Sequence, residues 1–577
     1  MNEQRKTPQA TPRGRRLRPT PKGRQPDAAA RAEVAALLGD APRQRDLLIE
    51  LLHRLQDRYG HLSARHLVAL AAELKLAPAE VYEVATFYHH FDVVKEGDEA
   101  PPEITVRVCE SIACELAGAR DLLTRLPAAL GADVRIVPAP CMGRCETAPV
   151  AMIGQNPLPH ATPERVAELV RAKAVKHPAR ESGATHPFLD IVSPPYVDYD
   201  AYRAGGGYAL ARACIAGERQ RDDVIAALEH AGLRGLGGAG FPAGRKWRAV
   251  AAEPAPRFLA INIDEGEPGT FKDRWHLERD PHRFLEGALI AAWAVGIDEI
   301  YIYLRDEYHG CRALLERELE RLRADPPVTL PPIHLRRGAG AYICGEESAM
   351  IESIEGKRGE PRLRPPYVAQ VGLFGRPTLE HNFETLHWVR DILEKGPEWF
   401  AGQGRHGRRG LRSFSVSGRV KRPGVYVAPA GITVKELIEE YCGGMQDGHT
   451  FYAYLPGGAS GGILPASLGD VPLDFDTLAP YGCFIGSAAI VILSDRDKAS
   501  DAARNLMRFF AAESCGQCTP CRVGTAKAVQ LLAADRWDQA LLKELSQAMA
   551  DASICGLGQA APNPVLSVIR YFPHEIG

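Results

Sequence analysis

Two sets of four cysteines, one toward each end of the chain, restrict what this sequence can fold into. In the C-terminal set, Cys515, Cys518 and Cys521 follow one another at C-x2-C-x2-C spacing, and Cys555 supplies a distant fourth thiol. A cubane cluster takes one thiolate for each iron, and three close cysteines with a distant fourth suit it. The sequence therefore predicts a [4Fe–4S] site in a helical domain over residues 496–577.

The N-terminal set has another spacing and indicates another cluster. Cys109 and Cys114 form a C-x4-C pair, and Cys141 and Cys145 form a C-x3-C pair after a strand–helix–strand pattern. Four soft thiolates on two loops at strand ends match a [2Fe–2S] cluster. Zinc is the alternative, although zinc ribbons favour C-x2-C knuckles. We expect a thioredoxin-like [2Fe–2S] domain over residues 103–175, preceded by a helical bundle over residues 29–95.

The overall composition argues against several classes of protein. The chain has 577 residues, which is enough for roughly three to five domains. Its formal net charge of −2 gives no reason to expect a nucleic acid or an anionic membrane as a partner. No apolar run approaches the roughly 20 residues that span a bilayer. Thirteen cysteines without a secretory signal indicate a reducing compartment, so we expect a cytoplasmic protein whose clustered thiols bind metal.

Two segments lack the pattern of a packed domain. Residues 1–28 are rich in basic residues and proline and contain one leucine and no aromatic residue, which predicts a disordered basic tail. The open alternatives are a basic arm that docks on a partner subunit and an organellar transit peptide. Residues 176–197 are rich in proline, serine and histidine without a period and are interpreted as a linker.

Between the cysteine sets lie glycine-rich and acidic segments suited to a phosphorylated, planar cofactor. A glycine run from Arg234 to Phe241 precedes Lys246, and its backbone N–H groups can converge on an anion that the lysine neutralises. An apolar strand from Phe258 then ends in acids and glycines, and ligands of α/β sheets sit at such strand ends. The stretch Gly340–Glu347 is again rich in glycine and acid. We expect an α/β cofactor-binding domain over residues 198–410.

The segment 411–495 combines short strands with one helix near 433–442, which predicts a ubiquitin-like β-grasp domain. Its glycine loop, Leu455–Ile463, is interpreted as structural. Cys344 stands alone among apolar residues and is interpreted as a packed side chain despite its glycine-rich neighbours. The fold class predicted from all these segments is a multidomain combination of α/β and α+β domains.

The two halves of the chain resemble two subunits of respiratory complex I. The bundle ending in Val84-Ala-Thr-Phe-Tyr88, followed by the N-terminal cysteine set, resembles the 24-kDa-type subunit, in which such cysteines ligate a [2Fe–2S] cluster. Residues 198–577 resemble the 51-kDa-type flavoprotein subunit through the glycine run, the Gly340–Glu347 stretch and Pro361-Arg-Leu-Arg-Pro-Pro-Tyr367. This resemblance implies FMN and NAD(H) as cofactors beside the two clusters, and an NADH-oxidising activity for residues 198–410.

Carried over by position, the resemblance assigns cofactor contacts to residues of these motifs. The FMN phosphate would be held by Gly235, Gly237, Gly238, Gly240 and Lys246. The flavin ring and ribityl chain would be surrounded by Asn262, Asp264, Glu265, Gly345, Glu346, Asn382 and Thr385. Contacts to NAD(H) and its surroundings would come from Phe241, Glu267, Tyr342, Glu347, Arg364 and Tyr367. The charge of Glu267 at the adenine ribose should repel a 2′-phosphate and favour NAD(H) over NADP(H).

Four positions depart from the family pattern, and no catalytic residue is implied. Leu236 replaces an arginine, Ala249 replaces an aromatic residue, Arg364 replaces a lysine, and His381 stands in place of an asparagine. Contacts through these side chains should therefore differ from those of the family. A catalytic acid or base is not required, because hydride passes directly between nicotinamide and flavin.

The chain should be half of an enzyme, because nothing in it resembles a molybdopterin, nickel or quinone site. It resembles most the beta (diaphorase) subunits of NAD-dependent molybdenum or tungsten formate dehydrogenases, through Gly23-Arg24-Gln25 and the segments Phe91–Gly97 and Tyr196–Tyr208. That resemblance implies a hetero-oligomer with a molybdopterin-containing catalytic alpha subunit that carries further Fe–S clusters. The alternatives are the diaphorase subunit of an NAD-reducing hydrogenase, a fused complex I module and, in another class, a non-catalytic Fe–S scaffold or NAD sensor.

Overall fold

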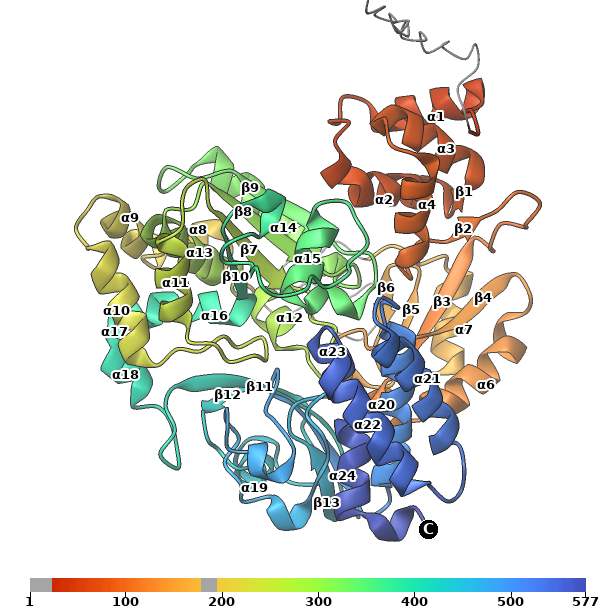
Figure 1. Ribbon diagram of the computed structural model, residues 1–577, viewed down its shortest axis with the longest axis vertical. Coiled ribbons are helices and arrows are strands. Elements are labelled where there is room, and N and C mark those ends of the chain that lie inside the picture. The colour runs from red at the N-terminus through yellow and green to blue at the C-terminus, as the bar shows by residue number, and fades with distance from the viewer. Residues whose placement is uncertain (1–22, 178–194) are drawn as a thin grey trace, which may run out of the picture.

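The structure is a computed structural model that describes residues 23–177 and 195–577. Most of the predicted tail (residues 1–22) and of the predicted linker (residues 178–194) lies outside the described residues. Along the chain come a helical bundle, a small mixed sheet, a parallel sheet with helices, a second mixed sheet and a C-terminal group of helices (Figure 1).

The N-terminal bundle is formed by α1 (Ala28–Leu38), α2 (Leu48–Tyr59), α3 (Ala64–Leu74) and α4 (Pro78–Phe87). Asp27 and Ser63 cap α1 and α3 with their side chains, and Pro78 occupies the first turn of α4. The leucines of α2 form one buried stripe, as the 3/4 spacing requires. A short parallel pair, β1 (Leu62–Ser63) and β2 (Val93–Val94), lies beside these helices.

The next domain is a four-stranded sheet whose topology explains how the N-terminal cysteines meet. Its strand order is β4 (Val134–Ala139), β3 (Ile104–Cys109), β5 (Ala151–Ile153) and β6 (Asn156–Leu158). It carries α5 (Ile112–Leu116), α6 (Ala119–Leu130) and α7 (Pro163–Arg171). Strands β3 and β4 are parallel, and Cys109 pairs with Ala139 at their ends. The loops that carry the two cysteine pairs therefore leave the sheet at the same edge.

The central sheet is parallel throughout, in the order β10 (Thr378–Asn382), β7 (Phe258–Ile263), β8 (Glu299–Leu304) and β9 (Ile333–Arg337). Ile261 and Ile302 face a core that includes α13 (Pro281–Val295) and α14 (His309–Ala324). Ala260 and Tyr303 face a second core, which contains α2 and α15 (Glu347–Ile354). Both faces are covered, as parallel sheets require, and all four strands end at one edge.

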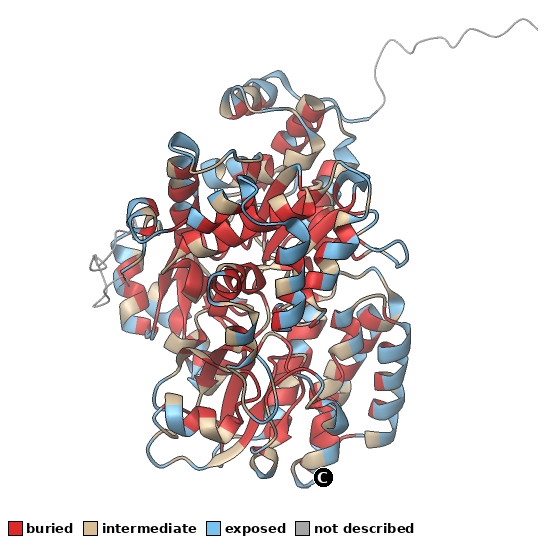
Figure 2. Cartoon of the chain, turned by 90° about the vertical axis from the view of Figure 1, so that its left-hand side faces the viewer, coloured by how far each residue is buried: buried red, intermediate tan, exposed pale blue. Residues whose placement is uncertain are grey.

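Shorter helices surround this sheet and complete the domain. They are α8 (Tyr199–Ala204), α9 (Ala209–Ile215), α10 (Arg221–Ala231), α11 (Ala243–Ala251), α12 (Lys272–Leu277), α16 (Phe383–His387), α17 (Val389–Lys395) and α18 (Pro397–Ala401). The 3₁₀ turn η3 (Tyr342–Gly345) lies within the glycine- and acid-rich stretch before α15. In Figure 2 buried residues fill the interior of these layers, and the exposed residues lie on the outer faces of the helices.

The second mixed sheet has the order β12 (Gly424–Pro429), β11 (Leu411–Gly418), β15 (Ala489–Ser494), β13 (Phe451–Leu455) and β14 (Leu464–Pro465). The helix expected near 433–442 begins as α19 (Val434–Glu436), which Thr433 and Glu436 cap reciprocally, and continues as the π turn η5 (Leu437–Tyr441). Phe414 and Val416 of β11 belong to the same hydrophobic core as Ile261 of the central sheet, so the two domains share one interior.

The chain closes with α20 (Ala499–Glu513), α21 (Thr519–Leu532), α22 (Gln539–Ala552), α23 (Gly556–Ala560) and α24 (Asn563–Tyr571). Helix α20 packs against α5, and α24 packs against β14, so these helices bridge the thioredoxin-like sheet and the second mixed sheet (Figure 1). Asn505 of α20 donates a hydrogen bond of 2.8 Å to the carbonyl of Glu110, beside Cys109. Over residues 23–177 and 195–577, no helix combines the length and apolar character needed to cross a membrane.

Candidate functional site

The end of β7 and the Gly340–Glu347 stretch approach each other at backbone distance. Asn262 Nδ2 donates to the backbone carbonyl of Gly345 over 2.9 Å, and Asn262 Oδ1 accepts from the backbone N–H of Asp264 over 3.0 Å. A Cβ atom at Gly345 would lie 3.2 Å from the carbonyl oxygen of Asp264. The glycine therefore lets two predicted cofactor-binding segments form one continuous wall.

Asp264 lies in this wall with one carboxyl oxygen available. Its Oδ2 atom is buried and has no hydrogen-bond partner among the described residues. Burial raises the pKa of the Asp264 carboxyl well above its usual range. Because a buried polar atom normally has a partner, this oxygen fits a bound group that donates a hydrogen bond, such as a hydroxyl of the ribityl chain.

The glycine run folds onto the end of β10. The N–H of Leu236 donates to Thr385 Oγ1 over 2.9 Å, and a Cβ atom at Gly237 would lie 2.9 Å from that of Asn382. Gly240 has a φ of +66°, which favours glycine. The structure thus brings the glycine run together with Asn382 and Thr385, and it leaves no room for side chains at Gly237 and Gly240.

Lys246 lies at the same strand end and has an acidic partner that the sequence did not predict. Its Nζ donates to the carbonyl and to the Oε2 of Glu380, over 3.0 and 3.2 Å, and lies 4.0 Å from Glu347. Burial raises the pKa of Glu380. Alternation along β10 puts Glu380 and Asn382 on one face and His381 on the other, where Trp247 Nε1 donates to His381 over 2.7 Å. His381 is therefore a packed residue of the core.

The two acids after Asp264 hold segments together. Glu265 accepts from the N–H groups of Asp273 and Arg274 over 2.8 and 3.1 Å and from the hydroxyl of Tyr308 over 2.8 Å. Burial, followed by the charge of Asp273, raises the pKa of Glu265 to about 7. Glu265 thus fixes the start of α12 on the turn that follows β7.

Glu267 connects that turn to two other segments. It accepts from the N–H and the hydroxyl of Ser460 over 2.8 and 2.7 Å, and from the hydroxyl of Tyr342. Ser460 belongs to the Leu455–Ile463 loop that we interpreted as structural. Its glycine-rich pattern was the signal available in the sequence, and the contact with Glu267 places this loop at the candidate site.

The remaining predicted residues form a charged and an aromatic group. Glu346 caps α15 by accepting from Ser348 and Ala349 N–H groups over 3.0 and 2.9 Å. Arg364 pairs with Glu346 and lies 3.1 Å from Glu347. Phe241 and Tyr367 are 48% and 56% exposed, so their ring faces are accessible to a planar ligand.

The C-terminal thiols gather directly behind η3. Cys515, Cys518, Cys521 and Cys555 line one small cavity together with Ile343. Tyr342, next to Ile343, donates from its backbone N–H to Glu513 over 2.9 Å. The Tyr342 ring packs edge-on against Phe509, with ring centroids 5.0 Å apart. Cys344 points elsewhere: it is buried in the second core and does not line this cavity. The [4Fe–4S] site therefore adjoins the Gly340–Glu347 wall.

The N-terminal thiols are docked onto the turn after β7. All four are buried, Cys109 faces Cys114 and Cys141, and the sulfurs of Cys141 and Cys145 lie 3.4 Å apart. Arg305 donates to the carbonyl of Cys141 over 2.7 Å and to that of Glu265. Arg274 donates to the carbonyl of Gly143 over 2.7 Å. Two buried arginines thus hold the second cysteine loop beside the cofactor wall.

The arrangement of the thiols suits clusters better than a single ion. Within the described part of the chain, no three His, Cys, Asp or Glu side chains converge to hold one metal ion. Four cysteines give each iron two thiolates in a [2Fe–2S] cluster and one thiolate in a [4Fe–4S] cluster. A structural zinc ion instead binds all four of its ligands itself. The geometry accordingly fits the two predicted iron–sulfur clusters.

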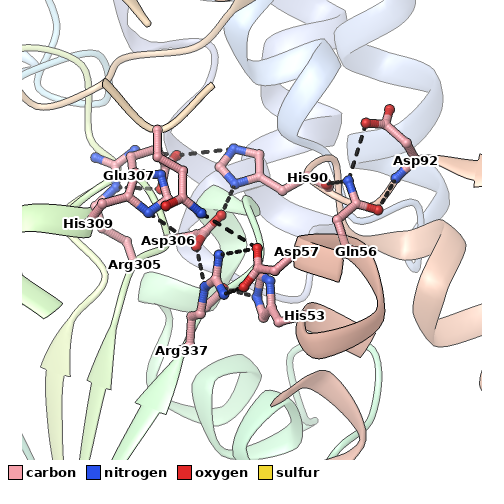
Figure 3. Close-up of polar contacts among 12 residues, drawn as sticks. His53, Gln56, Asp57, His90, Asp92, Arg305, Asp306, Glu307, His309 and Arg337 are labelled. Atoms are coloured by element: carbon pink, nitrogen blue, oxygen red, sulfur yellow. Dashed lines mark hydrogen bonds and ion pairs between the residues drawn. The ribbon is translucent and has the colours of Figure 1, made fainter. Parts of the chain in front are cut away.

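The helical bundle is attached to the same edge of the central sheet (Figure 3). His90 Nδ1 lies 2.7 Å from Asp306 Oδ2, and Arg337 donates to Asp306 over 2.5 Å and to Asp57 over 2.6 Å. Burial raises the pKa of Asp306, but Arg337 and His53 outweigh this and hold it well below its usual range. These contacts of Asp306 with His90 and Arg337, and of Arg337 with Asp57, therefore fix the bundle on the cofactor-binding domain.

Sequence models of known families match four segments of the chain. The Nuo51 FMN-binding domain matches residues 228–391, and the NADH-ubiquinone oxidoreductase-F iron–sulfur binding region matches residues 501–577. A thioredoxin-like [2Fe–2S] ferredoxin model matches residues 34–174 and thus includes the helical bundle. An SLBB domain matches residues 413–464 of the second mixed sheet. The predicted fold class and the predicted cofactors, FMN, NAD(H), [2Fe–2S] and [4Fe–4S], are confirmed.

Curated relatives and solved structures extend these matches. The second F-type chain of NADH-quinone oxidoreductase of Rhizobium meliloti (strain 1021) is 40% identical over 389 residues, which cover 65% of this chain and 92% of the relative. The mitochondrial 51 kDa subunit of NADH-ubiquinone oxidoreductase of Neurospora crassa is 40% identical over 62% of this chain and 76% of its own. A chain of NAD+-reducing [NiFe]-hydrogenase in the H2-reduced state superposes with a TM-score of 0.79 at 32% identity, over 92% of both chains.

The matched ranges of the family models include both thiol sets and most of the FMN-binding domain between them. The chain belongs to the family of F-type, FMN-binding chains of NADH-ubiquinone oxidoreductase and carries a thioredoxin-like [2Fe–2S] domain fused in front of the FMN-binding domain.

Proposed function

We propose that this chain is the diaphorase subunit of a cytoplasmic NAD-dependent formate dehydrogenase. As a family member it is an NAD-dependent flavin and iron–sulfur oxidoreductase. The observation that carries the proposal is that one wall, built from Asn262, Asp264 and Gly345, adjoins both thiol sets. Electrons from NAD(H) can therefore leave the site toward a partner subunit, and electrons from a partner can enter it.

FMN, when bound, exchanges electron pairs with nicotinamide and single electrons with iron–sulfur clusters. The residues of the chain would bind the flavin and the nicotinamide, orient them toward each other and shield them from water. The N–H groups of Gly237, Gly238 and Gly240 and the Lys246 ammonium would hold the phosphate, and Asp264 would accept from the ribityl chain; the N–H groups of Gly235 and Leu236 donate within the protein. Phe241 and Tyr367 offer their exposed faces to the adenine ring. Glu267, held by Ser460 and Tyr342, would lie beside the ribose and select against a 2′-phosphate, although burial raises the pKa of its carboxyl.

The choice of formate dehydrogenase rests on the sequence segments that resemble its beta subunits, Phe91–Gly97 and Tyr196–Tyr208, and on the presence of all four N-terminal cysteines. The partner would be a molybdopterin-containing alpha subunit that carries further Fe–S clusters. A second candidate is the diaphorase subunit of an NAD-reducing hydrogenase, which the match over 92% of both chains with such an enzyme favours.

Purification of the intact complex through a tag on this chain decides between the two candidates. We expect the complex to contain molybdenum or tungsten and to form NADH from NAD+ when formate is added. The matched control is the same preparation under hydrogen without formate, which should form no NADH. A complex that contains nickel and reduces NAD+ with hydrogen, but not with formate, would establish the second candidate instead.

A further inference from the structure

A cavity of about 280 Å³ lies where the glycine run meets the second mixed sheet. Its charged lining consists of Arg234, Arg408, Arg409, Arg412 and Asp474, and we call it the arginine cavity. None of the residues assigned above to FMN, NAD(H) or the clusters lines it. The arginine cavity is therefore separate from the redox site and has no part in the proposed function.

The arginine cavity carries an excess of positive charge. Four guanidinium groups face Asp474 in the lining and Asp476 beside it, so two positive charges are uncompensated. Asp474 is shared, because Arg408 donates to it over 2.7 Å and Arg412 over 3.1 Å. Arg234 pairs with Asp476, and Arg409 has no ion-pair partner in the described part of the chain. A divalent anion would balance this charge, whereas a monocarboxylate would leave half of it.

One of these arginines is buried with a donor unused. Arg412 is only 3% exposed, and its Nε has no hydrogen-bond partner among the described residues. Burial, with the charges of Arg234 and Arg408, lowers the pKa of Arg412 even though Asp474 opposes the shift. A buried donor without an acceptor is unfavourable, and the planar fork of arginine matches the oxygens of a phosphate group.

We propose that the arginine cavity binds the phosphate or pyrophosphate group of a small phosphorylated metabolite. The volume suits two linked phosphate groups with a small remainder, and it lies below the roughly 300–1,000 Å³ of pockets for larger ligands such as dinucleotides. The two uncompensated guanidinium charges favour a multivalent oxyanion over a neutral ligand.

Occupancy of the arginine cavity would reach the cofactor site through Phe475. The guanidinium groups of Arg234 and Arg412 lie 4.4 and 4.1 Å from the centre of the Phe475 ring. The same ring lies against Gly240, where an added Cβ would approach within 2.5 Å, and Arg234 Nε donates to the Gly240 carbonyl over 2.5 Å. An anion that binds Arg234 would therefore change the contacts of Arg234 with Gly240 and Phe475. Through these contacts it would affect the glycine run that borders the redox site.

Calorimetric titration of the FMN-loaded full chain with sodium phosphate and with sodium pyrophosphate at low ionic strength tests this proposal. We expect saturable binding at one site, with pyrophosphate the tighter ligand. Arg409→Gln should weaken pyrophosphate binding by roughly ten- to hundredfold, because a charge-assisted contact is lost. Arg409 is exposed, so its replacement should not disturb folding, and FMN content and the melting temperature check this. Arg412→Met should weaken binding at least as much.

The matched control is Arg496→Gln, an exposed arginine of the same sheet domain that donates to the Gly448 carbonyl and lies outside the arginine cavity. This variant should bind pyrophosphate like the unmodified chain. Absence of saturable binding would overturn the proposal. So would equal weakening by Arg409→Gln and Arg496→Gln, since that result would mean a general surface-charge effect.

Discussion

Replacement of Cys518 by alanine is expected to remove the [4Fe–4S] cluster and to leave the [2Fe–2S] cluster in place. Cys518 precedes α21 and lines the same cavity as Cys515, Cys521 and Cys555, and the two thiol sets share no cysteine. A cubane that loses one of its four thiolates is no longer held. The EPR spectrum of the reduced chain should keep one signal and lose the other, and the iron content should fall by about four atoms per chain.

Cys442→Ala provides the matched control for this variant. Cys442 is buried in the second mixed sheet domain and belongs to neither thiol set, so its replacement removes a thiol without touching a cluster. Both EPR signals should survive. If Cys518→Ala keeps both signals, the ligand assignment is wrong. If it loses both, the two sites depend on each other in a way that their separate locations do not explain.

Replacement of Arg305 by leucine is expected to cause the largest loss of stability among single changes near the site. Arg305 is 4% exposed and donates to the carbonyl of Cys141 over 2.7 Å, to the carbonyl of Glu265, and to Glu307 over 2.7 and 3.1 Å. Leucine would remove the guanidinium partner of the buried Glu307 carboxylate and of two carbonyls. Loss of one member of a buried ion pair lowers the free energy of unfolding by about 3–5 kcal/mol.

The midpoint of the first unfolding transition in urea measures this effect, and Arg248→Leu serves as its control. Arg248 is in the same domain, but its side chain is 49% exposed and pairs with Glu229 at the surface over 3.0 Å. Loss of such a pair lowers the free energy of unfolding by about 0–1 kcal/mol. Equal shifts of the midpoint in the two variants would mean that Arg305 does not anchor the cysteine loop.

Much of the site could be predicted because its signals are local. Spacing alone separated the two thiol sets, and the carboxyl end of an apolar strand located the acids after β7. The C-terminal segment 496–577, which we expected to be helical, is observed as α20 to α24. The side of the sheet on which His381 lies also depends on local sequence, because side chains alternate along β10 and His381 lies opposite its neighbours Glu380 and Asn382.

The partners that complete the site come from distant parts of the chain, and no local pattern encodes them. Glu267 is held by Ser460, which lies 193 residues further along, and Arg305 meets Cys141 across a separation of 164 residues. Glu380 is placed beside Lys246 because α11 packs against β10. Strand order and domain docking decide these contacts, and both depend on packing between segments rather than on spacing within one.

Flavin content and NADH oxidation of the purified full chain show whether the wall between the two thiol sets is a redox site. We predict about one FMN per chain and rapid reduction of an artificial dye by NADH, with NADPH a poor donor because Glu267 opposes its 2′-phosphate. A chain that contains both clusters but no flavin, and that reduces no dye with NADH, would contradict this prediction and leave a non-catalytic iron–sulfur scaffold as the better description.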